Sequence, residues 1–299
     1  MREIPRDTAR TFSIGGDLQV TRIGYGAMRL ADGPEPAPSA MEAHIWRPPA
    51  GRPGAIALLR RAVELGVNLI DTADAYALGA NEELIAEALH PYGDGVTVAT
   101  KVGVVRPSPT EWVPLGHPAY LRQQAELALR RLRVERIDLL QLHRIDPAYP
   151  LADQIGALAQ LRDEGKVRHI GLSEVGVDEL RQAAEITPIA SVQNMYNLSA
   201  RGHEAVVDHA AEHGIAFLPW FPFAAGAHAA PGSPLAEVAA EIGVTPAQAS
   251  LAWLLRRSPT VIPIPGTSSI AHLEENVAAL PVKLSDDQYD RLSAAVPSA

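Results

Sequence analysis

Eight short apolar runs rich in Val and Ile alternate along this chain with longer segments whose apolar residues recur every three or four positions. The runs are typical of buried strands and the longer segments of amphipathic helices. The strand candidates are RIGYGA from Arg22, NLID from Asn68, VTVATK from Val96, IDLLQLH from Ile137, VRHIGLS from Val167, ASVQN from Ala190, GIAFLPW from Gly214 and TVIPIPG from Thr260. The helix candidates cover residues 56–65, 82–89, 119–132, 152–164, 177–185, 203–212, 246–256 and 270–280. Such alternation predicts a single (β/α)8 barrel domain over residues 1–299, since this fold typically takes about 250 residues.

Three segments add to the plain barrel. Residues 11–24 predict a β-hairpin turned at Gly15-Gly16-Asp17, placed across the barrel floor. Residues 32–53 contain six prolines and predict a long loop on the active face, and residues 285–294 predict an added helix. A doubly wound open sheet is the structural alternative. It normally carries a G-x-G-x-x-G turn after its first strand, and GYGAMRL lacks the third glycine and leads into no helix.

Charge and composition narrow the class of partner. The net charge of -9 provides no basic stripe for nucleic acid or anionic lipid, so a small-molecule partner is expected. The chain has no cysteine, which excludes disulfides, thiolate metal sites and a cysteine nucleophile. No apolar core of signal-peptide length occurs near Met1, and the longest apolar stretch, residues 214–227, is too short and proline-broken to span a bilayer. A cytoplasmic location is therefore predicted.

Polar residues interrupt the apolar runs at their carboxyl ends, where a barrel carries its active site. They are Asp71, Lys101, His143, Ser173 with Glu174, and Gln193 with Asn194. The acid, the lysine and the imidazole come from neighbouring predicted strands, and Tyr76 follows the acid by five residues. These four side chains are expected to meet at one rim of the barrel.

This set of side chains suits proton transfer to a carbonyl oxygen. An adjacent ammonium stabilises a phenolate and shifts a tyrosine towards the working range, so Lys101 would activate Tyr76. Asp71 would hold Lys101 charged, and neutral His143 would orient the substrate oxygen. Taken singly, each residue has a structural explanation. Asp71 and Lys101 could be only a buried ion pair, Tyr76 a packed aromatic, and His143 a structural histidine whose hydrogen bonds are satisfied. All four together at the proper strand ends weaken that explanation.

The chain resembles the aldo-keto reductases almost end to end, from LQVTRIGYGAMRL to the EEN of the eighth predicted helix. NLIDTADAYALGANEELIAEAL matches the family segment with a catalytic Asp and Tyr, VTVATK carries its Lys, and DLLQLHRID its His. The matching positions are Asp71, Tyr76, Lys101 and His143. The resemblance implies a nicotinamide cofactor lying over the barrel mouth and hydride transfer to an aldehyde or ketone. Tyr76 would then supply the proton, with the carbonyl oxygen bound by Tyr76 and His143.

The nicotinamide contacts follow from two matched segments. GLSE implies Ser173 and Glu174 as partners of the cofactor amide, with Gln193 in SVQNMYN as the third. Many relatives have Asn in place of Glu174, and a carboxylate accepts from the amide nitrogen but does not donate to its oxygen. In LPWFPFAAG, Trp220 would stack on the nicotinamide ring, or would only pack against the barrel rim. Phe221 and Phe223 follow in the segment that would contact the pyrophosphate through its main chain.

The adenosine end is implied by IPGTSSIAHLEEN. Gly266, Thr267 and Ser268 lie near the start of a predicted helix, whose free amides favour a phosphate. Glu275 and Asn276 would contact the adenine. His272 stands where relatives that prefer NADPH usually have Arg, and imidazole offers little charge. NADP(H) is the expected cofactor, with NAD(H) as the alternative.

Four side chains are candidates for the substrate side: Met28, Arg29, Trp46 and Trp112. In many aldo-keto reductases the tail after the last helix closes the pocket, and here that tail is only residues 296–299. The resemblance therefore implies an open site or one gated by the first loop. A metal-dependent hydrolase is the competing enzyme class, but GYGAMRL has no H-x-H ligand pair. A cofactor-binding redox sensor or scaffold on the same fold is a further alternative. The identity of the carbonyl substrate, the oligomeric state and the physiological direction stay open.

Overall fold

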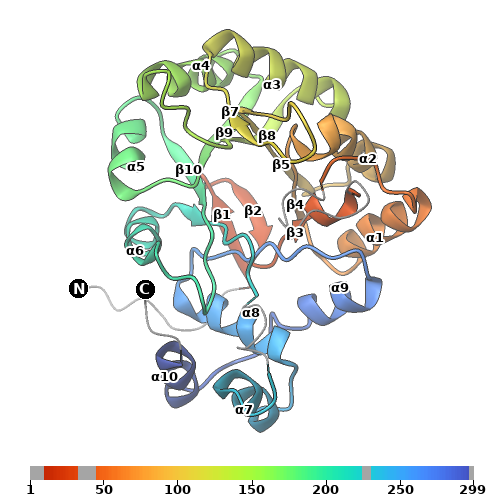
Figure 1. Cartoon of the computed structure of the whole chain (residues 1–299), viewed down its shortest axis with the longest axis vertical. Coiled ribbons are helices and arrows are strands. Elements are labelled where there is room, and N and C mark those ends of the chain that lie inside the picture. The colour runs from red at the N-terminus through yellow and green to blue at the C-terminus, as the bar shows by residue number, and fades with distance from the viewer. Residues whose placement is uncertain (1–9, 33–44, 224–229, 296–299) are drawn as a thin grey trace.

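A parallel sheet, curled so that its strands surround a common centre, forms the middle of the molecule (Figure 1). The computed structural model describes residues 10–32, 45–223 and 230–295. The sheet has seven strands in the order β11-β10-β9-β8-β5-β4-β3. Their bounds are β3 Tyr25–Gly26, β4 Leu69–Asp71, β5 Thr97–Val102, β8 Ile137–Leu142, β9 Val167–Ser173, β10 Ile189–Gln193 and β11 Ala216–Phe217. The predicted alternation of strands and helices, and hence an α/β fold with a parallel sheet, is confirmed.

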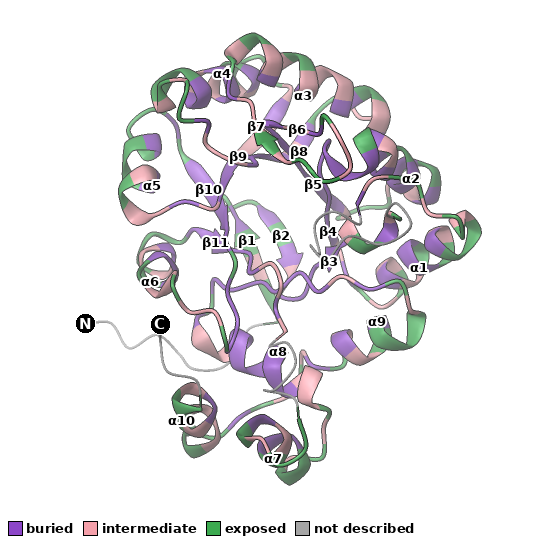
Figure 2. Ribbon diagram, viewed as in Figure 1, coloured by how far each residue is buried: buried purple, intermediate pink, exposed green. Residues whose placement is uncertain are grey.

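Helices surround the sheet, and their outward faces are exposed while the strands are buried (Figure 2). They are α1 Arg52–Glu64, α2 Ala80–Leu89, α3 Pro118–Leu132, α4 Leu151–Asp163, α5 Val177–Ala184, α6 Glu204–His213, α7 Pro234–Glu241, α8 Pro246–Arg257, α9 Ile270–Val277 and α10 Asp286–Ala294. All eight predicted helices and the added helix near the end are present. The sequence reasoning missed α7, whose signals were Ser233 as N-cap, Pro234 in the first turn and the apolar face of LAEVAA.

The eighth predicted strand is not a strand. Residues 260–265 make a single bridge, Val261 to Phe217, because Pro263 and Pro265 have no N–H to donate to a ladder. The segment nevertheless bonds on both sides. Ile262 N donates to Phe217 O at 2.8 Å, and Gly24 N donates to Pro263 O at 2.9 Å, so irregular backbone connects β11 to the region of β3.

The predicted hairpin is present as β1 Thr11–Ile14 paired antiparallel with β2 Leu18–Thr21. Gly15 and Gly16 turn it with φ of 62° and 88°, values that favour glycine. Ile14, Leu18 and Val20 pack in one apolar cluster with Leu69 of β4, Leu139 of β8 and further strand residues. The hairpin therefore covers apolar side chains contributed by the sheet.

Two predicted segments include residues that the structure does not describe. These are the long first loop, of which residues 33–44 lie outside the described residues, and the tail, of which all of residues 296–299 do. Residues 224–229 of the predicted pyrophosphate segment are also outside them. Within the described ranges, no single helix is long and apolar enough to cross a membrane, and α7 with α8 pass that test only as a pair bent by 91°.

Candidate active site

Asp71 and Lys101 form a buried ion pair at the carboxyl ends of β4 and β5. Lys101 Nζ donates to both carboxylate oxygens of Asp71, at 2.9 and 2.8 Å, and to the main-chain oxygen of Thr72 at 2.8 Å. Burial alone lowers the pKa of Lys101, but Asp71 and Tyr76 more than compensate and raise the pKa above its ordinary value. Lys101 is therefore a fixed ammonium at neutral pH.

Tyr76 lies beside this pair on the loop that follows β4. Lys101 Nζ is 5.2 Å from the centroid of the Tyr76 ring. The loop is tied to β5, since Asp74 N donates to Lys101 O at 3.2 Å. Directly after Tyr76, Ala77 and Leu78 adopt left-handed φ of 49° and 55°, a conformation that costs non-glycine residues about 1–2 kcal/mol each. The chain thus turns sharply at the point where the phenol is presented.

The pKa of Tyr76 differs from the sequence expectation. Burial raises the pKa above its ordinary value of 10, and the charge of Lys101 only partly opposes that rise. Loss of solvation outweighs the ammonium because Lys101 is itself neutralised by the Asp71 carboxylate. The phenol is therefore protonated at neutral pH and available as a proton donor.

His143 ends β8 and faces Tyr76, with 5.9 Å between the ring centroids. Burial, followed by the charges of Lys101, Arg144 and Arg106, holds the pKa of His143 well below its ordinary value. Its Nδ1 is buried and has no hydrogen-bond partner among the described residues. The imidazole is thus a neutral polar group with unused hydrogen-bonding capacity.

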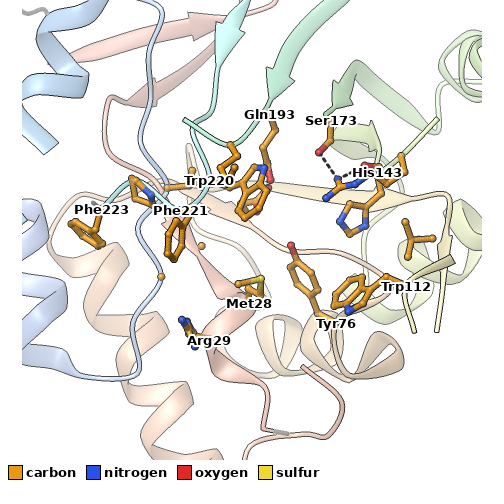
Figure 3. A pocket seen from close by; sticks show the side chains of 18 of the residues that line it. Met28, Arg29, Tyr76, Trp112, His143, Ser173, Gln193, Trp220, Phe221 and Phe223 are labelled. Atoms are coloured by element: carbon orange, nitrogen blue, oxygen red, sulfur yellow. Dashed lines mark hydrogen bonds between the residues drawn. The ribbon is translucent and has the colours of Figure 1, made fainter. Parts of the chain in front are cut away.

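Asp71, Tyr76 and His143 line a cavity of about 560 Å³ (Figure 3). Figure 3 shows Tyr76, His143, Trp112, Trp220 and Met28 projecting towards the same space from different segments of the chain. The cavity is lined by Gly26, Met28, Arg29, Asp71, Tyr76, Val104, Trp112, Pro114, His143, Arg144, Ser173, Gln193, Met195, Trp220, Phe221, Pro222, Phe223, Ile264 and Gly266. The four predicted catalytic residues therefore lie together. Asp71, Tyr76 and His143 line the cavity, whereas Lys101 does not line it and contacts Asp71 and Tyr76.

Ser173 and Gln193, two of the predicted amide partners, line the cavity. Gln193 Nε2 donates to Asp71 Oδ1 at 2.8 Å and to Gln141 Oε1 at 3.0 Å, so the side-chain oxygen is left as an acceptor. Ser173 Oγ accepts from Arg144 at 3.1 Å. Asn194 instead has a structural role, since its amide group bonds to both the N–H and the C=O of Val175.

Glu174, the third predicted amide partner, is engaged elsewhere. Its Oε1 accepts from Trp220 Nε1 at 2.5 Å and from Met195 N at 2.6 Å. Glu174 is not among the described residues that line the cavity. This geometry does not favour the predicted contact with the cofactor amide, because the Glu174 side chain is directed to Trp220 and Met195 and does not line the cavity.

Close backbone approach marks the opposite wall of the cavity. A Cβ at Gly26 would lie 2.6 Å from Ile264 O, and a Cβ at Gly266 would lie 2.8 Å from Gly26 O. Phe221 adopts a left-handed φ of 54° where the chain leaves Trp220. Phe221 and Phe223 line the cavity as well. This wall presents main chain and aromatic faces, which suits an extended, flat ligand.

Of the predicted adenosine residues, Gly266 lines the cavity, and the others lie just before or within α9, beyond the lining residues. Ser269 caps this helix by accepting from His272 N, and Thr267 Oγ1 accepts from Ser269 N at 3.0 Å. The carboxylate of Glu275 accepts from Thr245, and its main-chain oxygen accepts from Gln248 at 3.1 Å. Ser268 and His272 are exposed, whereas Asn276 is buried.

Of the four predicted substrate residues, Met28, Arg29 and Trp112 line the cavity and Trp46 does not. The Arg106 guanidinium lies 3.8 Å from the Trp112 ring centroid and 5.5 Å from that of Trp46. Trp112 in turn packs edge-on against Tyr76, at 6.3 Å, and His143, at 6.1 Å. Trp46 therefore supports Trp112 through Arg106.

The site residues that the sequence reasoning missed include Gln141, Arg144 and Met195. Gln141 occupies an inward position in an apolar strand, which is a signal for a buried polar contact. Arg144 directly follows His143, and its guanidinium donates to His143 O at 2.6 Å. Among the described residues no carboxylate forms an ion pair with Arg144, so a cation lines the cavity beside His143.

Comparison with known proteins gives a consistent result. The Aldo/keto reductase family model matches residues 22–297. An uncharacterized oxidoreductase of Schizosaccharomyces pombe is 46% identical over 278 residues, 93% of this chain and 87% of the relative. A pyridoxine 4-dehydrogenase of Escherichia coli is 41% identical over 291 residues, 95% of this chain and 98% of the relative. The crystal structure of an aldo/keto reductase from Klebsiella pneumoniae with NADP and acetate has a TM-score of 0.78, with 28% identity, 97% of this chain and 96% of that chain covered.

The described residues fit a bound nicotinamide dinucleotide. Gly26 and Gly266 line the cavity with main chain that carries no side chain, and Trp220 offers a flat apolar face to it. Gln193 keeps an acceptor for an amide N–H. With the family match over nearly the whole length, the chain therefore belongs to the aldo/keto reductase family, as an oxidoreductase that uses NADP(H).

Proposed function

We propose that the chain reduces an aldehyde or ketone to an alcohol with NADPH, and that Tyr76 is the proton donor. The observation that carries this proposal is the position of the Tyr76 phenol, in the cavity wall between the Lys101 ammonium and the neutral His143. A protonated phenol beside an ammonium can donate a proton and leave a phenolate that the ammonium stabilises.

The chemistry divides between the cofactor and the chain. Bound NADPH supplies the hydride to the carbonyl carbon. His143 and Tyr76 bind the carbonyl oxygen and stabilise the negative charge that develops on it, and Tyr76 then transfers its proton to that oxygen. Lys101, held by Asp71, offsets the charge left on the phenolate. Because burial keeps His143 neutral, it orients the oxygen without competing as an acid.

The cofactor contacts are part of the same proposal. Ser173 and Gln193 hold the nicotinamide amide, Trp220 stacks on the ring, and Phe221 and Phe223 flank the pyrophosphate. Gly266, Thr267 and Ser268 bind phosphate, while His272, Glu275 and Asn276 surround the adenosine end. We also infer that residues 260–265 close the sheet into a barrel and that the β1–β2 hairpin covers its floor, supported by the bonds to Phe217 and Gly24 and by the apolar cluster around Ile14. A cytoplasmic location stays a prediction.

The substrate class we favour is an aromatic aldehyde. The cavity wall beside Tyr76 and His143 is built from Trp112, Met28 and Val104, which suits a flat ring, and Arg144 adds a cation beside His143. The relative from Escherichia coli is named for dehydrogenation of pyridoxine, and the corresponding carbonyl compound, pyridoxal, carries an acidic ring hydroxyl next to its aldehyde. Pyridoxal is therefore the first substrate to test.

The test is NADPH oxidation over a panel of carbonyl compounds, with pyridoxal, benzaldehyde and a simple sugar, in the native chain and in Tyr76→Phe. We expect turnover with aromatic aldehydes and a loss of about 10²–10⁴-fold in kcat for the variant, with NADPH binding retained. Tyr149→Phe, a change of the same type at a half-buried tyrosine outside the cavity, is the matched control.

The redox sensor is the second candidate, and the same assay separates it. A sensor or scaffold would bind NADPH but oxidise it no faster with any carbonyl compound than without one. Equal rates in the native chain and in Tyr76→Phe would remove Tyr76 from its proposed role. The buried ion pair of Asp71 and Lys101 beside Tyr76 supports catalysis over sensing, because a binding protein has no need for a stabilised phenolate.

A further inference from the structure

The carboxylate of Glu174 holds the indole of Trp220 from the side that does not face the cavity. Glu174 Oε1 lies 2.5 Å from Trp220 Nε1, and Met195 N donates to the same oxygen at 2.6 Å. Trp220 lines the cavity and projects into it, as Figure 3 shows, while Glu174 is not a lining residue in the described ranges. The contact joins residues 46 positions apart in the sequence.

The backbone explains why Glu174 points this way. Glu174 follows β9 in a left-handed conformation, with φ of 56°, which is uncommon for a residue with a side chain. Its N–H still donates to Gln193 O at 3.1 Å, so the turn is held against β10. The side chain thereby leaves the direction of Ser173 and reaches the segment at Met195 and Trp220. This strained backbone conformation is retained because the hydrogen bonds that Glu174 accepts from Trp220 and Met195 depend on it.

The position of Trp220 is fixed at two points. Trp220 N donates to Asn194 O at 3.2 Å, and the indole N–H is held by Glu174. His203 adds to the same network, with Nε2 at 3.6 Å from Glu174 Oε2 and Nδ1 at 3.1 Å from Asn194 Nδ2. Burial would raise the pKa of Glu174, but the hydrogen bonds from His203, Trp220 and Met195 prevail and lower it, so the carboxylate is charged.

From this geometry we propose that Glu174 is a positioning residue that acts through Trp220, holding the indole against the nicotinamide ring and favouring the oxidised cofactor over the reduced one. A carboxylate that accepts from the indole N–H enriches the π-face of the ring. An electron-rich face attracts the cationic ring of NADP⁺ more strongly than the neutral ring of NADPH. The inference rests on the proposed stacking of Trp220 and assigns Glu174 a role other than that of amide ligand.

The experiment measures the Kd of NADP⁺ and of NADPH by titration of tryptophan fluorescence, in the native chain and in Glu174→Gln. The glutamine keeps an oxygen for the two donors and removes only the charge. We expect Kd for NADPH to change little and Kd for NADP⁺ to rise roughly three- to tenfold. Glu185→Gln removes the same charge from an exposed position near the end of α5 and should leave both values unchanged. An unchanged ratio of the two Kd values in Glu174→Gln would overturn the proposal.

A double-mutant cycle shows whether the charge acts through the indole. Trp220→Phe keeps a flat ring but removes the N–H, so Glu174→Gln in that background should no longer alter the ratio of the two Kd values. If the ratio still changes as much as in the native background, the charge acts directly on the cofactor and the role of Trp220 is overturned. Thermal unfolding of each variant checks that the fold is intact.

Trp220→Leu separates this inference from the proposed function. If Trp220→Leu binds both cofactors as tightly as the native chain, Trp220 does not stack on the nicotinamide and the inference falls, together with that cofactor contact. If Trp220→Leu weakens both while Glu174→Gln changes neither, stacking stands and only the role of Glu174 fails. Carbonyl reduction through Tyr76 is tested independently of both results.

Discussion

The two halves of the sheet are built differently. In one half, which we call the regular half, β4, β5, β8, β9 and β10 each pair in parallel with the next over three residues or more. β8 and β9 are aligned from Ile137 and Val167 to Leu142 and Leu172, and the pairing of β9 with β10 has one register shift, between Ile189 and Ser191. The other, irregular half consists of β11, residues 258–266 and β3. There the strands pair over two residues each, and residues 260–265 form only an isolated bridge.

The difference follows the chemistry that each half supports. The regular half positions charged or titratable side chains, such as Lys101 and His143, whose placement requires a rigid backbone. The irregular half presents glycine main chain and aromatic faces, and prolines there interrupt the ladder. An extended cofactor binds where it can approach the main chain closely. The irregular half, which exposes main chain in place of regular strand pairing, therefore suits the cofactor that we propose for it.

The largest expected effect concerns the regular half. Lys101→Met removes the ammonium and leaves the Asp71 carboxylate buried with Gln193 Nε2 as its remaining side-chain donor. We expect kcat to fall by about 10²–10⁴-fold, because the phenolate of Tyr76 loses its stabilising charge. The free energy of unfolding should fall by about 3–5 kcal/mol, as for other broken buried ion pairs. Steady-state kinetics and urea unfolding measure the two effects.

The double variant Asp71→Asn with Lys101→Met separates catalysis from stability. Without the unpaired carboxylate, most of the lost stability should return, whereas activity should stay low. Recovery of activity along with stability would mean that the pair only supports the fold. That result would remove the distinction between the two halves.

The next largest effect concerns the irregular half. The buried guanidinium of Arg22 donates to the main-chain oxygens of Leu255, Ser258 and Val261, and burial lowers its pKa to about 10. Arg22→Met would leave these oxygens without that donor, at a cost of about 1–3 kcal/mol for each buried group that stays unsatisfied. We expect the free energy of unfolding to fall by about 3 kcal/mol and KM for NADPH to rise more than kcat falls.

The control for Arg22 is Arg60→Met, which removes a single main-chain hydrogen bond, to Ala88 O, from an exposed position. Its unfolding free energy should stay within about 0.5 kcal/mol of the native value. If Arg22→Met instead lowered kcat and left KM for NADPH unchanged, the irregular half would not be the cofactor side.

The sequence predicts the regular half well and the irregular half less well, for physical reasons. Asp71, Lys101 and His143 interrupt apolar runs, and parallel strands bring their carboxyl ends to one edge, so local patterns predict a shared site. In TVIPIPG the apolar pattern predicts a strand that the two prolines prevent. The contact of Glu174 with Trp220 depends on a left-handed backbone and on tertiary packing, neither of which a local pattern reports.

A smaller effect is expected at Asp74, on the loop that follows β4 of the regular half. Both carboxyl oxygens of Asp74 are buried without hydrogen-bond partners among the described residues. Burial and the nearby Glu82 carboxylate raise the pKa of Asp74 well above its ordinary value of 3.8. The folded chain thus holds a proton that the unfolded chain releases, so native stability falls as pH rises above that ordinary value. Asp74→Asn removes this loss and should stabilise the chain by about 1 kcal/mol at neutral pH.

The pH dependence distinguishes this cause from improved packing. Urea unfolding at intervals between about pH 5 and pH 8 should show the advantage of Asp74→Asn growing as pH rises, up to the folded-state pKa. Asp94→Asn, at an exposed position, serves as the control. An advantage that is the same at every pH would show that Asp74 is not protonated in the folded chain.

The smallest effect is expected at His272, on the first turn of α9 at the edge of the irregular half, where Ser269 accepts from its N–H. His272→Arg places a permanent cation where the proposal puts the 2′-phosphate of NADPH. An exposed charge pair contributes about 0.2–1 kcal/mol, so the ratio of kcat/KM for NADPH over NADH should rise roughly two- to fivefold and shrink in high salt. His213→Arg, on the exposed end of α6, adds the same charge away from α9 and should leave the ratio unchanged. Because NADH lacks this phosphate, an equal gain for NADH would mean that the cation acts on a part common to both cofactors, and the start of α9 would no longer distinguish them.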